Sequence, residues 1–508
     1  MFDVMLAALG GLVTSPSIMG YMLLAVALGL LVGVMPGIGG KLSVAMAIPF
    51  VYGMDMLTGA VFLLTMHAVN GTSGQISSID FGIPGESDDA ATTLDGYPLA
   101  RKGEAARGLG ASITAAGVGG IFGAMVFAVM IPLLQPIVLQ FGPSEFFLVA
   151  ILGISCIAFL SSGRKIVKGL IVGCLGLILS TVGMDPQTGT ARYSGDMLFL
   201  WDGINLVAAM LGLFAVPEVI ALGARGGSIS SVPRNENTFS YRQLLSGVAE
   251  VPRHWFLVLR TSMIGALVGM VPGLGGSVAA WLCYGHAVQT SKTPELFGRG
   301  AIEGVIAPEA ASNSKEGGSL LPTLFFGIPG SSGMAILLGA FLMLGIQPGA
   351  RLMTEHLDIA WTLIWALVIG NLMAVAILLV LCRWVAVLTF VDGRLLVPFI
   401  MAFIALGCYV SAFQWQNLIV LVLFGALGYT LMRCGWPRAP LVIGLILGGE
   451  AEQSLSLALQ LWGIFFFLRP LSLIIIALIV GLMIYAVYRN LRPAYRAARR
   501  EQANEPTR

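Results

Sequence analysis

Long apolar runs recur along the whole chain and decide its structural class. Many of them reach or approach the roughly 18 residues that a helix needs to cross the hydrocarbon core of a bilayer. Charged residues gather in the short segments between the runs, as is typical of chains that cross a membrane many times. The pattern predicts an all-α, polytopic helical membrane protein. The clearest candidate spans are 18–34, 109–131, 146–160, 166–182, 199–222, 255–271, 361–381, 395–409, 417–431 and 471–488.

Two breaker motifs occur twice in the chain, in the same order. The first is PGxGG, at residues 36–40 and 272–276, and the second is GIPG, at residues 82–85 and 327–330. Proline lacks a backbone donor and glycine lowers helix stability, so each motif should interrupt the membrane helix that carries it. Broken helices at matching places in two halves of a chain indicate a transporter binding site. The sequence therefore predicts two repeat units, each with a broken or re-entrant helix.

The balance of charge between the apolar runs predicts how the chain is threaded through the membrane. Basic segments at 101–107, 164–168 and 224–254 should lie in the cytoplasm, as should the arginine-rich end of the chain at 489–508. The segments that follow the two GIPG motifs differ in charge, because 101–107 is basic and 351–358 is net negative. This difference suggests that the two repeat units are inverted with respect to the membrane.

These features divide the chain into five predicted parts. They are a first repeat unit with scaffold helices at 1–223, a cytoplasmic linker at 224–254, a second repeat unit at 255–360, C-terminal scaffold helices at 361–488, and a basic cytoplasmic tail at 489–508. No basic residue precedes the first apolar run, so we expect no cleavable signal peptide, and the first span should act as the insertion signal. The scaffold helices could also contact a second copy of the chain, as a homo-oligomer would require.

Composition supports this class and argues against others. Of the 508 residues, 57% are hydrophobic and 11% are charged, and the mean hydropathy is +0.89. The net charge is only +2, without a basic cluster that would suit nucleic acid. The six cysteines lack metal-ligand spacing, which favours a packing role, and we expect no cofactor. Neither a P-loop nor a catalytic Ser-His-Asp pattern occurs, so ATP-driven transport and enzymatic catalysis are not indicated.

The PGxGG motifs predict a substrate site. Where a helix starts again after the glycines, its free amide groups and its dipole favour an anion. A lysine at the position of Lys41 either holds an anionic substrate or reaches a membrane interface, and the sequence leaves both open. The hydroxyl groups beside the GIPG motifs add further donors. The predicted substrate-binding residues are Pro36, Gly37, Gly39, Gly40, Lys41, Gly85, Ser87, Pro272, Gly273, Gly275, Gly276, Ser277, Gly330, Ser331 and Ser332.

Polar side chains between the breaker motifs suggest a cation site. Segments 70–75 and 313–319 are polar within otherwise apolar sequence. A single aspartate after a breaker is explained as a helix cap, but the adjacent Asp88 and Asp89 favour contact with an ion or the substrate. For the lone histidines, such as His67, we favour a structural role over proton relay. The residues that point to the cation site are Asn70, Thr72, Ser73, Asp88, Asp89, Thr92, Asn313 and Ser319.

Two longer stretches resemble a known family. Residues 94–103, LDGYPLARKG, resemble the LDGYPMARxG signature of the large membrane subunit of tripartite tricarboxylate transporters, the TctA family. Residues 300–313, GAIEGVIAPEAASN, are similar to that family's GAIEGVAAPEAANN stretch. The resemblance extends over most of the chain and includes both pairs of breaker motifs.

The resemblance implies a secondary transporter of the bacterial inner membrane. Such a transporter imports a carboxylate of the tricarboxylate or dicarboxylate type by symport, driven by a sodium or proton gradient. Its partners would be a small membrane subunit and a periplasmic solute-binding protein that delivers the substrate. The resemblance also places Glu309 and Asn313 around the site, with Na⁺ as the only metal ion to consider.

The chain departs from the family before and within the first GIPG region. The family has a GxYYGxxYGGS stretch there, whereas this chain reads MHAVNGTSGQ at 66–75, followed by Asp80 and the acids of 86–89. These acids put the usual carboxylate contacts in question and indicate either a different substrate or a stronger cation site.

Our interpretation is a carboxylate importer in which a moving bundle slides or rocks against a scaffold, in the manner of elevator transporters. Two alternatives belong to other classes. A passive anion channel would use the duplicated breakers to line a filter. A membrane-embedded enzyme would need a convergent catalytic set, which the sequence does not show.

Overall fold

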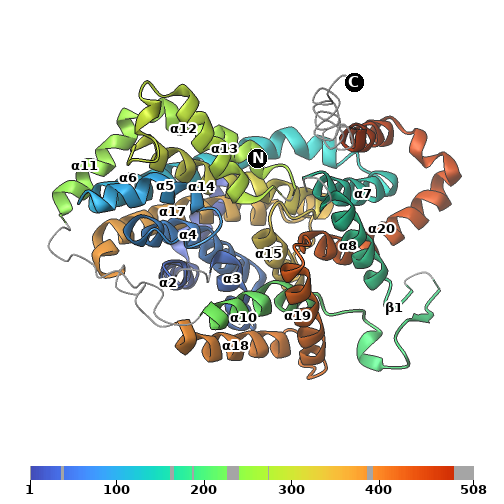
Figure 1. The fold of residues 1–508 in the computed structure, drawn as a ribbon. Helices are drawn as coiled ribbons and strands as arrows, with labels where there is room; N and C mark the ends of the chain where they lie inside the picture. Colours follow the sequence, from blue (N-terminus) through green and yellow to red (C-terminus); the bar gives the residue numbers. More distant parts are fainter. Residues whose placement is uncertain are drawn as a thin grey trace, which may run out of the picture. The chain divides into compact units, whose positions relative to one another are not determined.

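The chain is almost entirely helical. The structure, a computed structural model, describes residues 2–35, 39–160, 165–185, 188–225, 240–272, 274–385 and 393–484. Within these ranges the only strands are β1 (Gly183–Met184) and β2 (Ala191–Arg192), which pair antiparallel (Figure 1). The predicted all-α class is therefore confirmed.

Several helices are long and apolar enough to cross a membrane, as predicted for a multi-pass membrane protein. Within the described residues these candidate spans are Pro16–Gly33, Ala105–Val138, Leu206–Ala224, Leu357–Trp384 and Ala439–Leu468. The last of them was not among the spans predicted from the sequence. Glu450 and Glu452 interrupt its apolar pattern, and this hides a continuous helix from a search for apolar runs.

The chain divides into two compact units. The larger unit comprises Met1–Leu139 and Asn205–Thr430, and the smaller unit comprises Gln140–Ile204 and Leu431–Arg508. All four breaker motifs belong to the larger unit. The candidate site can therefore be described within that unit alone.

The larger unit is a bundle of helices with the following bounds. They are α1 (Phe2–Thr14), α2 (Pro16–Gly33), α3 (Gly39–Val51), α4 (Met56–Phe81), α5 (Ala90–Arg101), α6 (Ala105–Val138), α9 (Leu206–Met210), the π-helical turn η2 (Leu211–Ala215), α10 (Val216–Arg225), α11 (Tyr241–Arg253), α12 (Trp255–Gly269), α13 (Gly275–Thr290), the 3₁₀ turn η4 (Pro294–Leu296), α14 (Glu303–Phe326), α15 (Ser332–Met343), α16 (Ala350–Thr354), α17 (Leu357–Val385), α18 (Gly393–Val410) and most of α19 (Asn417–Arg433). Part of the predicted linker thus forms α11, which packs on α6.

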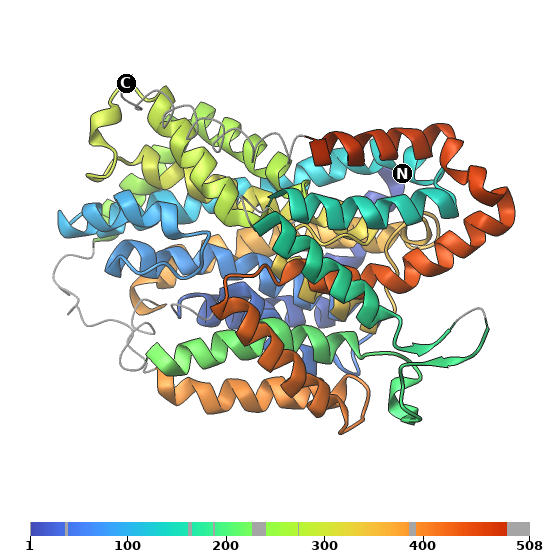
Figure 2. The ribbon, with the colours of Figure 1, turned by 45° about the vertical axis from the view of Figure 1, so that its right-hand side comes forward.

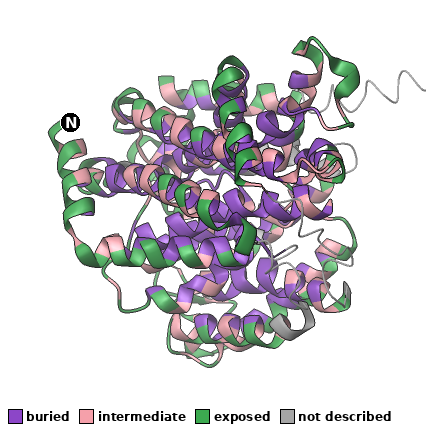
Figure 3. Cartoon of the chain, turned by 90° about the vertical axis from the view of Figure 1, so that its left-hand side faces the viewer, coloured by how far each residue is buried: buried purple, intermediate pink, exposed green. Residues whose placement is uncertain are grey.

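Helices α4 and α14 form the centre of the larger unit. Both are buried along nearly their whole length. Helices α2 and α3 pack on α4, while α12 and α13 pack on α14. Figures 1 and 2 show these two groups next to one another, the first in blue and the second in yellow-green. Buried positions gather in the interior and exposed positions lie on the outer helices (Figure 3).

The smaller unit contains α7 (Pro143–Leu160), α8 (Lys165–Ser180), the 3₁₀ turn η1 (Leu198–Leu200), α20 (Ala439–Trp462) and the 3₁₀ turn η6 (Gly463–Leu468). Helix α20 packs against both α7 and α8. The guanidinium group of Arg192 donates to both carboxylate oxygens of Glu452, at 2.6 and 2.9 Å. This bidentate pair fixes the β-ribbon against α20.

The predicted helix breaks are present at all four motifs. Helix α2 ends at Gly33 before the first PGxGG and α12 ends at Gly269 before the second. Each GIPG begins with a glycine in the left-handed conformation, with φ of +69° at Gly82 and +67° at Gly327. In both, the amide of the following isoleucine donates to a carbonyl in the last turn of the preceding helix, at 3.3 and 3.1 Å. Glycine ends both helices because it adopts this conformation without strain.

Glycines also let the helices of each group approach closely. Along α2 and α12, a Cβ atom added at Gly29, Gly33, Gly265 or Gly269 would come closer than 3.0 Å to a backbone carbonyl oxygen of α4 or α14. Small residues at this spacing are typical of tightly packed membrane helices. The repeat thus extends beyond the motifs into the packing of the helices before them.

We predict that Gly269→Ala destabilises the protein by about 1–3 kcal/mol, because the added methyl group meets backbone atoms of α14 that cannot move aside. Gly285→Ala on α13 is the matched control, since nothing lies within 4 Å of its added Cβ. The midpoint of thermal unfolding in detergent measures both. Equal midpoints for the two variants would contradict the close packing of α12 on α14.

Candidate functional site

The loop between α4 and α5, residues 82–89, is called here the acidic tip. Asp89 is buried, and its Oδ2 accepts a hydrogen bond from the amide of Glu86 at 2.9 Å. Gly85 lies against Gly74 of α4, and a Cβ added at Gly85 would lie 2.7 Å from the Gly74 carbonyl oxygen. The tip is therefore packed tightly on the helix that precedes it, and its acids have fixed positions.

The start of α3 faces one acid of the tip. The amide of Gly40 donates a hydrogen bond to Oε1 of Glu86. A Cβ added at Gly40 would also lie 3.3 Å from Oδ1 of Asn70 and 3.3 Å from Nδ1 of His67. Those two buried atoms make no hydrogen bond within the described chain. The free amides at this helix start thus serve a carboxylate of the protein itself.

The start of α13 faces another acid of the same tip. A Cβ added at Gly276 would overlap Oδ2 of Asp88 and lie 3.1 Å from Cε of Lys315. The ammonium group of Lys315 lies 3.5 Å from Oδ2 of Asp88. The sequence predicted that both helix starts would favour binding of an anion. In the structure, the anions there are side chains of the acidic tip.

A chain of buried ion pairs connects the two helix starts. Nε2 of His67 lies 3.2 Å from Glu316, and the other carboxylate oxygen of Glu316 lies 2.6 Å from Nζ of Lys315. Lys315 in turn contacts Asp88. Only 4% of the Lys315 side chain is exposed, so the desolvated ammonium group depends on these carboxylates. Together with Glu86, three carboxylates face one lysine and one histidine.

The residues predicted for the cation site meet in pairs that join α14 to α4 and to α5. Nδ2 of Asn313 donates to Oγ1 of Thr72 at 2.8 Å, and the hydroxyl of Thr92 donates to Oε1 of Glu309. Oε2 of Glu309 is buried and has no hydrogen-bond partner among the described residues.

Two predicted serines of this set bond to their own helices instead. Ser73 donates to the Asn70 carbonyl at 3.1 Å and Ser319 donates to the Lys315 carbonyl at 2.9 Å. Over the part of the chain that the structure describes, no group of three His, Cys, Asp or Glu side chains could hold a metal ion.

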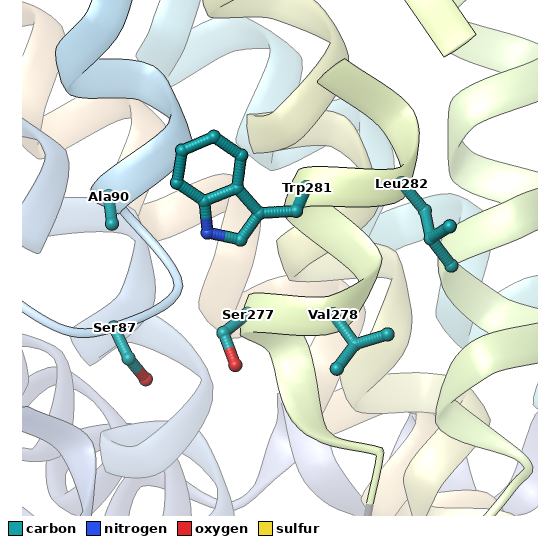
Figure 4. A pocket seen from close by; sticks show the side chains of 6 residues that line it. All are labelled: Ser87, Ala90, Ser277, Val278, Trp281 and Leu282. Carbon is teal, nitrogen blue, oxygen red and sulfur yellow. The ribbon is translucent and has the colours of Figure 1, made fainter. Parts of the chain in front are cut away.

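A pocket of about 600 Å³ opens between the acidic tip and α13 (Figure 4). Ser87 of the acidic tip and Ser277 of α13, both predicted from the sequence, line it, and Figure 4 shows the Trp281 indole reaching from α13 toward Ala90. Its lining residues are Ser87, Ala90, Ser277, Val278, Trp281 and Leu282.

The other predicted substrate residues have backbone roles or lie outside the description. Gly39 and Gly275 begin helices, and Pro272 lies in the turn before α13. Gly330 packs on Ser319, much as Gly85 packs on Gly74.

The hydroxyl of Ser331 accepts from the Met334 amide at 3.2 Å, which caps α15, and Ser332 is the first residue of that helix. Pro36, Gly37, Gly273, the side chain of Lys41 and the tail at 489–508 lie outside the described residues.

Sequence reasoning omitted three charged residues from the site: Glu86, Lys315 and Glu316. The signal was present, because Lys315 and Glu316 are adjacent charges inside the helix between two breakers. Such charges in a membrane helix are costly and point to function. Their partners could not be read from the sequence, since Asp88 is 227 positions from Lys315.

The two stretches that resemble the TctA family meet through Asp95. Its Oδ1 accepts from the amides of Gly300 and Ala301 at 2.8 and 2.9 Å, and its Oδ2 accepts from the Tyr284 hydroxyl at 2.9 Å. A buried carboxylate with three donors is well satisfied. Asp95 therefore anchors α5, which follows the acidic tip, to the segment before α14.

Comparisons with known proteins agree with this picture. A model of the tripartite tricarboxylate transporter TctA family matches residues 19–443. The chain is 33% identical over 481 residues to an uncharacterised 52.8 kDa protein in the TAR-I ttuC′ 3′ region of Agrobacterium vitis, and the match covers 92% of both chains. It is 36% identical over 239 residues to an uncharacterised protein in the TAR-II ttuC′ 3′ region of the same organism, covering 46% of this chain and 97% of that protein. No solved structure matches the chain significantly.

Proposed function

This chain belongs to the tripartite tricarboxylate transporter TctA family, and we propose that it imports a carboxylate by secondary active transport, driven by a sodium or proton gradient. TctA is a transporter family and not an enzyme family. The family implies a tripartite system with a small membrane subunit and a binding protein. In our proposal that binding protein is periplasmic and delivers the carboxylate to this chain at the bacterial inner membrane.

One observation carries the proposal: segments next to both copies of the breaker motifs contribute side chains to the same site. Ser87, beside the first GIPG motif, and Ser277, beside the second PGxGG motif, line one pocket. Asp88, also beside the first GIPG motif, pairs with Lys315 of α14, the helix that ends at the second GIPG motif. Secondary transporters place their sites at the interface between repeats, where broken helices expose backbone dipoles. A movement of one proposed repeat unit relative to the other would change access to such a site.

We place the carboxylate in the pocket at the start of α13. There the Ser277 hydroxyl and the amides of the first helical turn can donate, whereas the Ser87 hydroxyl already donates to Oδ1 of Asp88 at 3.1 Å. The coupling cation belongs beside the oxygens of Thr72, Glu309 and Asn313, where one Glu309 oxygen is buried without a hydrogen-bond partner among the described residues. The C-terminal tail is cytoplasmic in this proposal, and access alternates by an elevator-type movement.

The gradient requirement separates this proposal from a passive anion channel. The complete complex, reconstituted in vesicles with labelled carboxylates, should accumulate one of them above its external concentration when a sodium or proton gradient is imposed. Collapsing both gradients with ionophores should abolish that accumulation. Equilibration at the same rate with and without a gradient would contradict secondary transport and support the channel.

The inverted arrangement of the repeats predicts opposite faces for two exposed glutamates. Glu104 follows the first GIPG motif and Glu355 follows the second, and their side chains are 39% and 59% exposed. Cysteines at these positions, in a chain with Cys156, Cys174 and Cys434 replaced by serine, should react with a membrane-impermeant maleimide from opposite sides. Glu104→Cys should be cytoplasmic. Labelling of both variants from one side would rule out the inverted arrangement.

A further inference from the structure

Helices α12 and α13 form a hairpin with the second PGxGG motif at its tip. Near the tip, Val268 of α12 packs in one cluster with Ala279 of α13. At the other end, Leu257 of α12 packs with Ala287 of α13. The two helices therefore run antiparallel, and Figure 1 shows them side by side. The beginning of α12 and the end of α13 thus lie together at the end away from the motif, called here the open end.

Arg260 brings a positive charge to the open end of this hairpin. Its guanidinium group lies 4.6 Å from the centre of the Phe256 ring and donates a hydrogen bond of 3.5 Å to the Thr290 hydroxyl of α13. No carboxylate of the described residues pairs with it, and its buried Nε has no hydrogen-bond partner among them either. A cation in an apolar helix is costly unless a counter-charge or water compensates it. The protein, as far as it is described, does not supply that counter-charge.

The outward face of α12 is apolar on both sides of Arg260. Phe256, Met263 and Leu267 are 54%, 44% and 52% exposed. Together with Arg260 they follow the three- and four-residue spacing of one helix face. This face therefore presents one charged group on an apolar stripe, which matches a ligand with an anionic head and apolar chains.

The distance of Arg260 from the motif places it at the level of lipid head groups. This step rests on the proposed function, because the broken helices of secondary transporters lie near the middle of the bilayer. Arg260 lies nine residues before Gly269, where α12 ends, which is about 13 Å of helix. Half of the hydrocarbon core is about 15 Å thick. Phe256 then lies among the head groups, and Met263 and Leu267 lie along the acyl chains.

The other charges at the open end do not oppose an anion. After α13, Lys292 and Arg299 flank Glu295, and all three residues are exposed. Before α12, Glu250 lies 2.7 Å from Arg107. The segment 224–254, which leads into α12, is a basic segment expected in the cytoplasm. The cytoplasmic leaflet carries anionic lipids, which basic segments attract.

The first copy of the motif lacks this charge. Counted from the PGxGG motif, Leu24 of α2 corresponds to Arg260, and it is 44% exposed. The close packing of α2 on α4 and of α12 on α14 is shared by both copies. A charged residue at this place is therefore not needed for the packing of the helix.

We propose that the outward face of α12 binds an anionic phospholipid, whose phosphate pairs with Arg260 and whose chains lie along Met263 and Leu267. The Nη1 group and the second hydrogen of Nη2 are available for the phosphate, since the one hydrogen bond of the guanidinium within the described chain uses Nη2. A planar guanidinium group binds a phosphate through two parallel hydrogen bonds. Because Arg260 also bonds to Thr290, the bound lipid stabilises the contact of α12 with α13, the helix that lines the pocket.

Thermal unfolding of the full chain in detergent, with lipid added back, tests the proposal. The probes are phosphatidylglycerol and phosphatidylcholine with identical acyl chains. Phosphatidylglycerol should raise the unfolding midpoint by about 2–4 °C more than phosphatidylcholine does, because a ligand that binds only the folded state stabilises it. Glycerol 3-phosphate, which has the phosphate without the chains, should leave the midpoint unchanged.

Substitutions of Arg260 connect this difference to the site. Arg260→Gln should remove most of the difference between the two lipids, and Arg260→Lys, which keeps the charge without the planar fork, should keep part of it. Arg351→Gln is the matched control, because it removes an arginine that is 63% exposed and pairs with Glu355. This control should keep the full difference. Native mass spectrometry of the same variants should show a retained phosphatidylglycerol that Arg260→Gln loses.

Equal midpoints with the two lipids in the unmodified chain would overturn the proposal, as would an unchanged difference in Arg260→Gln. A shift of the same size with glycerol 3-phosphate would show a site for a soluble anion and contradict a lipid site. Loss of the phosphatidylglycerol effect in the complete complex would show that the small membrane subunit covers this face instead. The comparison of the probes needs no variant, so it holds even if Arg260→Gln does not fold. The proposed function is tested separately, by accumulation on a gradient.

Discussion

The contact between Lys315 and Asp88 is the interaction on which the site depends. An ammonium group buried to this extent persists only when carboxylates compensate the loss of hydration, and Asp88 and Glu316 supply them. Because Asp88 belongs to the acidic tip and Lys315 to α14, the pair holds the acidic tip against this central helix. This contact places Ser87, which precedes Asp88, close to Ser277 of α13, and the pocket lies between them.

The segments around the two copies of the breaker motifs share their helix packing and differ in chemistry. Asn70 of α4 and Lys315 of α14 are equivalent positions in the two copies. The backbone carbonyl of Asn70 packs against Gly33, the last residue of α2, and that of Lys315 packs against Gly269, the last residue of α12. One place thus holds a neutral amide and the other a cation. The tips differ in the opposite sense, since the first is acidic and the second has serines. The acidic tip and Lys315 of α14 complement each other, so the two copies of the motif pair contribute unequally to one asymmetric site.

The sequence was sufficient for the features that depend on local chemistry. Proline and glycine break helices wherever they occur in a pattern such as GIPG, so the breaks at Gly82 and Gly327 were predictable. Length and hydropathy were sufficient for the class. Ser87 and Ser277 were predicted separately from their nearness to breakers, but only the fold shows that they share a pocket.

The rest depended on long-range partners. The sequence identified Glu86 only as an additional acid. Its role became visible when the fold placed it at the start of α3, where it accepts a hydrogen bond from the Gly40 amide. The span Ala439–Leu468 was missed because its glutamates hide it, and Glu452 is satisfied by Arg192, which lies far away in sequence. Charged groups in a membrane protein are interpretable only together with the groups that compensate them.

A double-mutant cycle on Asp88 and Lys315 tests the central claim most directly. Thermal unfolding in detergent would be followed for Asp88→Asn, Lys315→Gln and the double variant. The account predicts that Lys315→Gln alone is strongly destabilising, because it leaves buried carboxylates uncompensated, and that adding Asp88→Asn restores part of the loss, with a coupling energy of about 0.5–3 kcal/mol. Strictly additive effects of the two substitutions would show that the tip and α14 are not held together by this pair.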